Sequence, residues 1–197
     1  MPRFALSLSA SLRVAAPLMS MLVLSGCFGI APKPAPAPLP PLSKGQPLTT
    51  ADAAFVQALN EADLTDIALA KLATTNAARN DVRALSDTVS RDSAETRTKL
   101  GEIVSPHDLS LTTAPMRDDQ EMIDRMAKLY GARFDSAYLA HLRKGEPILS
   151  AAIASAIAQS KNADLIALAK DSQSKIAAHK ASAEALAPAR VSRRHRR

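Results

Sequence analysis

The chain has 197 residues, enough for one domain with appendages, and its hydrophobic content of 47% is sufficient for a buried core. Only 3% of the residues are aromatic and Trp is absent, and this alanine- and leucine-rich composition favours helix over strand. The net charge is +6, but all 19 acidic residues and only 16 of the 25 basic residues lie in residues 50–189, so this part is mildly acidic and a basic nucleic-acid-binding face is excluded.

The first 27 residues have the three-part organisation of a secretory signal. Two arginines come before residues 14–24, an 11-residue apolar stretch that is too short for the ~20 residues of a membrane-spanning helix. Leu24-Ser25-Gly26-Cys27 follows and matches the bacterial lipobox, and Cys27 is the only cysteine of the chain. We therefore predict a signal peptide over residues 1–26 and lipidation of Cys27. The alternative is an ordinary signal peptide with a chance cysteine.

The residues after Cys27 predict where the anchored protein lies. Two or more fatty chains hold a protein stably on a membrane without a spanning helix. Phe28 follows Cys27, in the place where an Asp usually retains Gram-negative lipoproteins in the inner membrane, so we expect the periplasmic face of the outer membrane. The rest of residues 27–49 is a Pro/Ala-rich linker, which we predict to be an extended spacer of ~3.1 Å per residue.

From Thr49 onward, apolar residues recur with the 3.6-residue period of a helix. We predict a first helix over residues 51–75, capped by Thr50 or Asp52, and a second over residues 80–104, capped by Asn80 and ended by Ser105-Pro106. The inward-facing side chains of the first helix are expected to be Phe55, Leu59, Ala62, Leu69 and Ala73. Those of the second helix are expected to be Val82, Leu85, Val89, Thr96, Leu100 and Ile103.

Three more helices are predicted. A short one covers residues 117–130 and ends at Gly131, a fourth covers residues 134–160, and a fifth starts after Asn162 and ends near Ala187. Because Pro147 costs ~3 kcal/mol inside a regular helix, we expect a kink or break there, which either opens space in the core or divides two shorter helices. The elements predict an all-α fold over residues 50–187: an antiparallel four-helix bundle with one short extra helix in the second crossover.

Residues 188–197 are predicted to be a basic, disordered tail, because no apolar period continues past Pro188. This tail is either merely solvated or touches an anionic envelope surface. Such contact would use Arg193, Arg194, Arg196 and Arg197.

Polar side chains on inward-facing stripes are the candidate functional residues. Asp66, Asp92, His141 and His179 each fall on such a stripe, on four different helices. Carboxylates and imidazoles together ligate divalent metals. However, the sequence has no Glu-x-x-His pair of the kind that di-iron bundles use, and a lone His on an apolar stripe is more often a hydrogen-bonded core residue. His107 and His195 are assigned no role.

No motif places a nucleophile beside a base, and the single cysteine is used for lipid. We therefore predict no catalytic residue and disfavour an enzyme.

Several segments together resemble a known family. They are Phe55-Val56, residues 66–73, Val89-x-x-Asp92, Phe134-Asp135-x-x-Tyr138 and His179. Over residues 52–186 the chain resembles the bacterial ferritin-like domain of unknown function, often labelled "predicted outer membrane protein" or periplasmic protein. The resemblance implies a ferritin-like bundle in the periplasm or at the outer membrane, and it implies no established reaction.

The chain departs from this family at three positions. Ser93 and Glu146 stand where the family tends to have His, and Ala68 stands where an acid is common. If the family pattern is a metal site, the resemblance leaves four ligands in this chain, for Fe, Mn or Zn. They are Asp66, Asp92, Glu146 and His179.

Two functions of different classes follow. The first is a lipid-anchored, non-enzymatic envelope protein without a cofactor, in a structural, stress-related or partner-binding role. The second is a metal-binding or redox ferritin-like protein. Close convergence of the four candidate ligands would favour the second.

Overall fold

The computed structural model describes residues 47–107 and 109–187, and throughout these ranges the regular structure is helical, with no strand. The helices are α1 (Thr50–Asn76), α2 (Asn80–Val104), η1, a 3₁₀ turn (Ser105–His107), α3 (Arg117–Ala127), α4 (Ala132–Lys144), α5 (Pro147–Gln159) and α6 (Ala163–Leu186). The prediction of an all-α fold is confirmed. The predicted signal peptide, the lipid site at Cys27, most of the linker and the basic tail with His195 lie outside the described residues.

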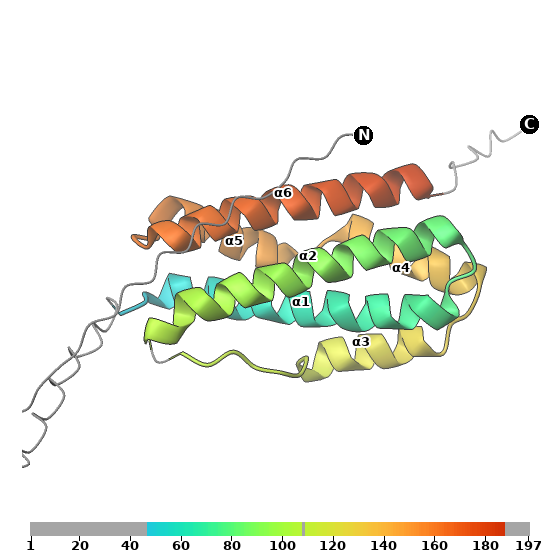
Figure 1. The fold of residues 1–197 in the computed structure, drawn as a ribbon, viewed down its shortest axis with the longest axis horizontal. Helices are drawn as coiled ribbons and strands as arrows, with labels where there is room; N and C mark the ends of the chain where they lie inside the picture. The colour runs from blue at the N-terminus through green and yellow to red at the C-terminus, as the bar shows by residue number, and fades with distance from the viewer. Residues whose placement is uncertain (1–46, 108, 188–197) are drawn as a thin grey trace, which may run out of the picture. The chain divides into compact units, whose positions relative to one another are not determined.

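The long helices run side by side in four rows (Figure 1). α1 packs against α2 and α5, α2 packs against α6, and α6 packs against both α4 and α5, which follow each other in one row. α3 covers α1 from outside and lies along its lower side in Figure 1. Within the described residues, no helix combines the length and apolar character needed to cross a membrane.

The first helix begins one residue earlier than predicted. Thr49 is its cap: the Thr49 hydroxyl accepts a hydrogen bond from the Asp52 backbone N–H at 3.1 Å, and the Asp52 carboxylate accepts one from the Thr49 N–H at 3.0 Å. This reciprocal capping box satisfies two backbone donors that a helix start leaves unpaired. Thr50, one of the two predicted caps, is instead the first helical residue.

The predicted cap of the second helix is wrong. Asn80 is the first residue of α2, and the residue before it, Arg79, makes no side-chain capping bond. The Asp135 carboxylate of α4 instead accepts hydrogen bonds from the N–H groups of the two residues just before α2, Ala78 at 3.1 Å and Arg79 at 3.2 Å. A carboxylate more than fifty residues away along the sequence therefore fixes the backbone that leads into α2.

The helix predicted over residues 134–160 is two helices, α4 and α5. α4 ends at Gly145, which has φ 61° and ψ −177°, and α5 starts with Pro147, where a missing N–H costs nothing. The earlier helix α3 ends at Ala127, three residues before the prediction. The chain then turns through Gly131 at φ 62°, whose N–H donates to the Asn76 carbonyl at 2.8 Å.

Buried apolar side chains form two clusters, one at each end of the helical rows. The first core includes Leu69, Ala73, Val82, Leu85, Val89, Phe134, Tyr138 and Leu139. The second core includes Phe55, Leu59, Ala62, Leu100, Val104, Leu149, Ile153 and Leu165. The predicted inward stripes of the first two helices are confirmed as buried, except that Ile103 is half-buried. Each fully buried Leu, Val or Phe contributes about 1.5–3 kcal/mol relative to an exposed one.

Candidate functional site: a polar layer between two cores

Polar residues occupy the level between the two apolar cores. On α1, Asp63 and Asp66 come between Ala62 of the second core and Leu69 of the first core. The other rows contribute polar residues at the same level, and the break between α4 and α5 lies there too. The polar layer, as we call it, consists of Asp63, Asp66, Asp92, Ser93, His141, Glu146, Ser172 and His179.

Asp92 of α2 and His179 of α6 form the shortest side-chain contact of the layer. His179 Nε2 lies 2.7 Å from Asp92 Oδ2, and the whole His179 residue is 8% exposed. The sequence placed both residues on inward stripes. The structure brings them together as a hydrogen-bonded pair across two packed helices.

Asp66 of α1 and His141 of α4 form a second, longer pair, with His141 Nε2 3.3 Å from Asp66 Oδ1. Burial alone would lower the pKa of His141, but the hydrogen bond and charge of Asp66 outweigh it, and the pKa is raised above the usual value. Both side chains are largely screened from solvent. Each of the two inward histidines therefore has a carboxylate partner.

Asp63 is the functional candidate that the sequence analysis missed. It is 6% exposed, and its Oδ2 atom has no hydrogen-bond partner. Burial, followed by repulsion from Asp66, raises its pKa to about 8, although Ser93 and Arg97 act in the opposite direction. Asp63 follows Leu59 by four residues and precedes Asp66 by three, so its helical spacing was the signal that could have found it.

Two small cavities adjoin the polar layer. One of about 30 Å³ is lined by Asp63, Asp92 and Ser93, and one of about 40 Å³ by His141 and Glu146; Asp66 and His179 line both. Cavities of this size hold a water molecule or a small ion, whereas sites for organic ligands measure roughly 300–1,000 Å³. These two cavities can therefore hold protons, water or an ion, and they are too small for an organic substrate.

The four predicted metal ligands all line these cavities, three to each. Asp66, Asp92 and His179 line the smaller cavity, and Asp66, Glu146 and His179 line the larger one. However, within the described ranges no three His, Cys, Asp or Glu residues are grouped so that they could hold a metal ion.

The environment of Glu146 disfavours its charged form. Burial, together with Asp119 and Asp66, raises the pKa of Glu146, although His141 lowers it.

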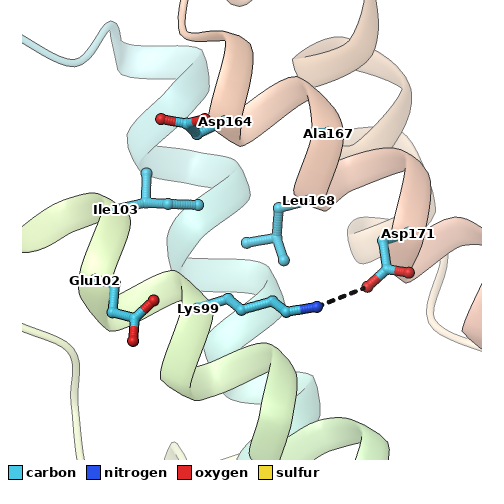
Figure 2. A pocket seen from close by; sticks show the side chains of 7 residues that line it. All are labelled: Lys99, Glu102, Ile103, Asp164, Ala167, Leu168 and Asp171. Atoms are coloured by element: carbon cyan, nitrogen blue, oxygen red, sulfur yellow. Dashed lines mark ion pairs between the residues drawn. The ribbon is translucent and has the colours of Figure 1, made fainter.

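Larger hollows lie on the surface, among them one of about 540 Å³ lined by Thr49, Asp52 and Lys161. The α2–α6 hollow, of about 460 Å³, is lined by Glu102, Asp164 and Leu168, and its Lys99 ammonium lies 3.8 Å from the Asp171 carboxylate (Figure 2). A further hollow measures about 740 Å³ and is formed by α1 and the first turns of α3 and α5. Its wall includes Ile148, which is 78% exposed.

Comparison with known proteins identifies the family. No curated protein and no solved structure matches the chain. The model of one family, described as "Domain of unknown function (DUF4142)", matches residues 37–186. This range covers most of the chain and all six α-helices of the described part. The chain therefore belongs to the DUF4142 family.

Proposed function

We propose that this chain is a lipid-anchored protein of the bacterial envelope that binds a protein partner at its surface and catalyses no reaction. One contrast carries the proposal: the interior cavities measure about 30 and 40 Å³, while the hollow beside Ile148 measures about 740 Å³. Ile148 and Met116 are large apolar side chains that remain 78% and 43% exposed next to it. Exposed apolar side chains gathered at a hollow are typical of protein-binding surfaces.

We further propose that the helical domain is a ferritin-like four-helix bundle. The four packed rows support this, and α3 lies in the connection between the second and third rows, as the extra element was predicted to do. The membrane anchor rests on the lipobox at Cys27 and on the Pro/Ala-rich linker. The capping box at Thr49 starts the folded part just after that linker, which suits a domain held away from the lipid on a spacer.

Replacing the lipid-accepting thiol tests the anchor. Cys27→Ser in the full chain, expressed with its own leader, should leave the protein unlipidated, so that it is either released from membranes or left unprocessed. The measurement is membrane fractionation with intact mass of the product. A mutant with the same mass increment and the same fractionation as the parent would refute the lipid anchor.

A photo-crosslinking residue placed at position 148 in living cells tests the partner-binding role. The expected result is a discrete protein adduct, because Ile148 lies in the wall of the hollow. The matched control is the same residue at position 84, an exposed alanine on α2 away from the hollow. If both positions give the same products, or neither gives one, the hollow is no binding surface.

A metal-binding or redox protein is the second candidate, and one observation favours it. The unpartnered carboxylate oxygen of Asp63 borders the same cavity as Asp92 and His179. A divalent cation, Fe, Mn or Zn, would displace the proton of Asp63 and accept its unpartnered oxygen as a ligand. The ligands would come from Asp66, Asp92, Glu146 and His179, as predicted, with Asp63 added.

A further inference from the structure

The hollow beside Ile148 is acidic, and we call it the acidic hollow. Its charged wall is formed by Glu61 of α1, Asp118 and Asp119 of α3, and Glu146 just before α5. Met116 and Ile148 supply apolar surface beside these carboxylates. Among the described lining residues, Arg117 is the single base, so the hollow has an excess of negative charge.

Glu61 shows that this negative charge is incompletely satisfied. It is 7% exposed; its Oε1 atom accepts a hydrogen bond from the Met116 N–H, but its Oε2 atom has no partner. Burial and the neighbouring carboxyls of Asp119 and Glu146 raise its pKa above the usual value. A cation bound in the hollow would relieve this repulsion.

The arrangement favours a guanidinium group over a metal ion. No three acidic, His or Cys side chains in the described part of the chain are grouped closely enough to hold a metal. A guanidinium is larger and presents five N–H donors in a planar fork, so that it can reach separate carboxylates. Its three-methylene stem also packs on apolar surface while its head stays on a charge, which matches Met116 and Ile148 beside Glu146.

The chain itself carries such a ligand. Residues 190–197 contain five arginines and no acid, and the nearest preceding acid is Glu184. We propose that the acidic hollow binds the arginine-rich segment Arg190–Arg197 of a second copy of this chain. The inference rests on the partner-binding role proposed above and names the partner as a second copy.

The fold disfavours the segment of the same copy. α6 ends beside the turn between α1 and α2, where Arg79 Nη1 donates to the Leu186 carbonyl at 2.9 Å. From Asn76, at that end of α1, back to Glu61 is about 22 Å of helix. Arg190, four residues after Leu186, reaches at most about 14 Å, whereas Arg197, eleven residues after Leu186, reaches at most about 40 Å. Within one copy only the last arginines of the segment could therefore reach the hollow, whereas a second copy can present all five. The segment of a second copy is not limited by this distance. In addition, tethering of both copies to one membrane raises the effective concentration of each segment around the neighbouring copy.

The direct test is binding of a fluorescent peptide of residues 188–197 to the full chain, followed by anisotropy. We expect saturable binding that Asp119→Asn/Glu146→Gln weakens about tenfold or more, since close charge pairs are lost. The matched control is Glu102→Gln/Asp164→Asn, which removes the same charge from the α2–α6 hollow and should leave Kd nearly unchanged. No binding, equal weakening in both variants, or binding of the peptide to anionic liposomes only, overturns the proposal.

Circular dichroism melting checks that both double variants fold. If Asp119→Asn/Glu146→Gln does not fold, Asp118→Asn, at an exposed position of the hollow, takes its place.

A second test uses the photo-crosslinking residue at position 148. We expect an adduct of twice the chain mass that contains residues 190–197 and disappears when they are deleted. An adduct within one chain, or with another protein only, overturns this inference. The latter result would still support the partner-binding role, so the two failures are distinguishable.

Discussion

At the level of single residues, the polar layer concentrates carboxyl groups away from water. A buried, ionised carboxylate is costly unless charges or hydrogen bonds compensate it. Asp66 and Asp92 have this compensation from His141 and His179, whereas one oxygen of Asp63 has none. Asp63 therefore takes up a proton at neutral pH, as its pKa of about 8 indicates.

Asp63 is expected to make the stability of the domain depend on pH. Its pKa is about 8 when folded against ~3.9 when unfolded, so its contribution is fully present below pH ~4 and is lost as the pH rises toward 8. The free energy of unfolding should fall by up to about 1.4 kcal/mol per pH unit in this window. Asp63→Asn, which stays neutral, should therefore melt higher than the parent by a margin that grows from pH 5 to pH 8.

Thermal unfolding monitored by circular dichroism at several pH values measures this margin. Asp87→Asn, at an exposed position of α2, is the control and should follow the parent at every pH. A constant difference between Asp63→Asn and the parent across pH would show that Asp63 is ionised in the folded protein.

His179 distinguishes a core hydrogen bond from a metal ligand. Loss of its bond to Asp92 in His179→Ala should lower the free energy of unfolding by about 1 kcal/mol, because the half-buried Asp92 carboxylate loses its partner. We expect no rise in melting temperature on addition of Fe²⁺, Mn²⁺ or Zn²⁺. A metal at one hundred times its Kd would stabilise the fold by about 2.7 kcal/mol. A metal-dependent rise in the parent that is lost in His179→Ala would establish the second candidate function.

At the level of helices, the ends with local caps were the predictable ones. The start of α6 was predicted from Asn162, whose side-chain oxygen accepts hydrogen bonds from the N–H groups of Asp164 and Leu165. The start of α1 was missed by one residue because Thr49 and Thr50 are both good caps in sequence. The start of α2 could not be read locally, because the Asp135 carboxylate that bonds to Ala78 and Arg79 belongs to α4, more than fifty residues later in the sequence.

The break between α4 and α5 depends on Gly145. With φ 61° and ψ −177°, it has a backbone conformation that residues with a Cβ rarely adopt, so Gly145→Ala should destabilise the domain by about 1–3 kcal/mol. Gly101→Ala is the matched control: its new Cβ inside α2 would lie 3.9 Å from Leu111, an ordinary contact. This control should be neutral or stabilising by up to about 1 kcal/mol. Equal destabilisation of the two variants in urea unfolding would contradict the prediction.

At the level of the whole molecule, the sequence predicted which face of each helix is buried, but it did not predict which residues on different helices meet. Phe55, Leu69, Val89 and Leu100 were placed in the core because a 3.6-residue stripe identifies the buried face. The stripe gives no register between helices, so the pairing of Asp92 with His179 was not predictable. Asp63 was not predicted because one polar residue was expected on each stripe, whereas α1 carries two, Asp63 and Asp66, three residues apart.

The two cavities also have a mechanical consequence. Their space, about 30 and 40 Å³, exists as a defined space only while the helices stay packed. Hydrostatic pressure favours whichever state has the smaller total volume, and the volume lost on unfolding scales with such internal voids. Compression should therefore act on the centre of this domain first, at the level where its two cores meet.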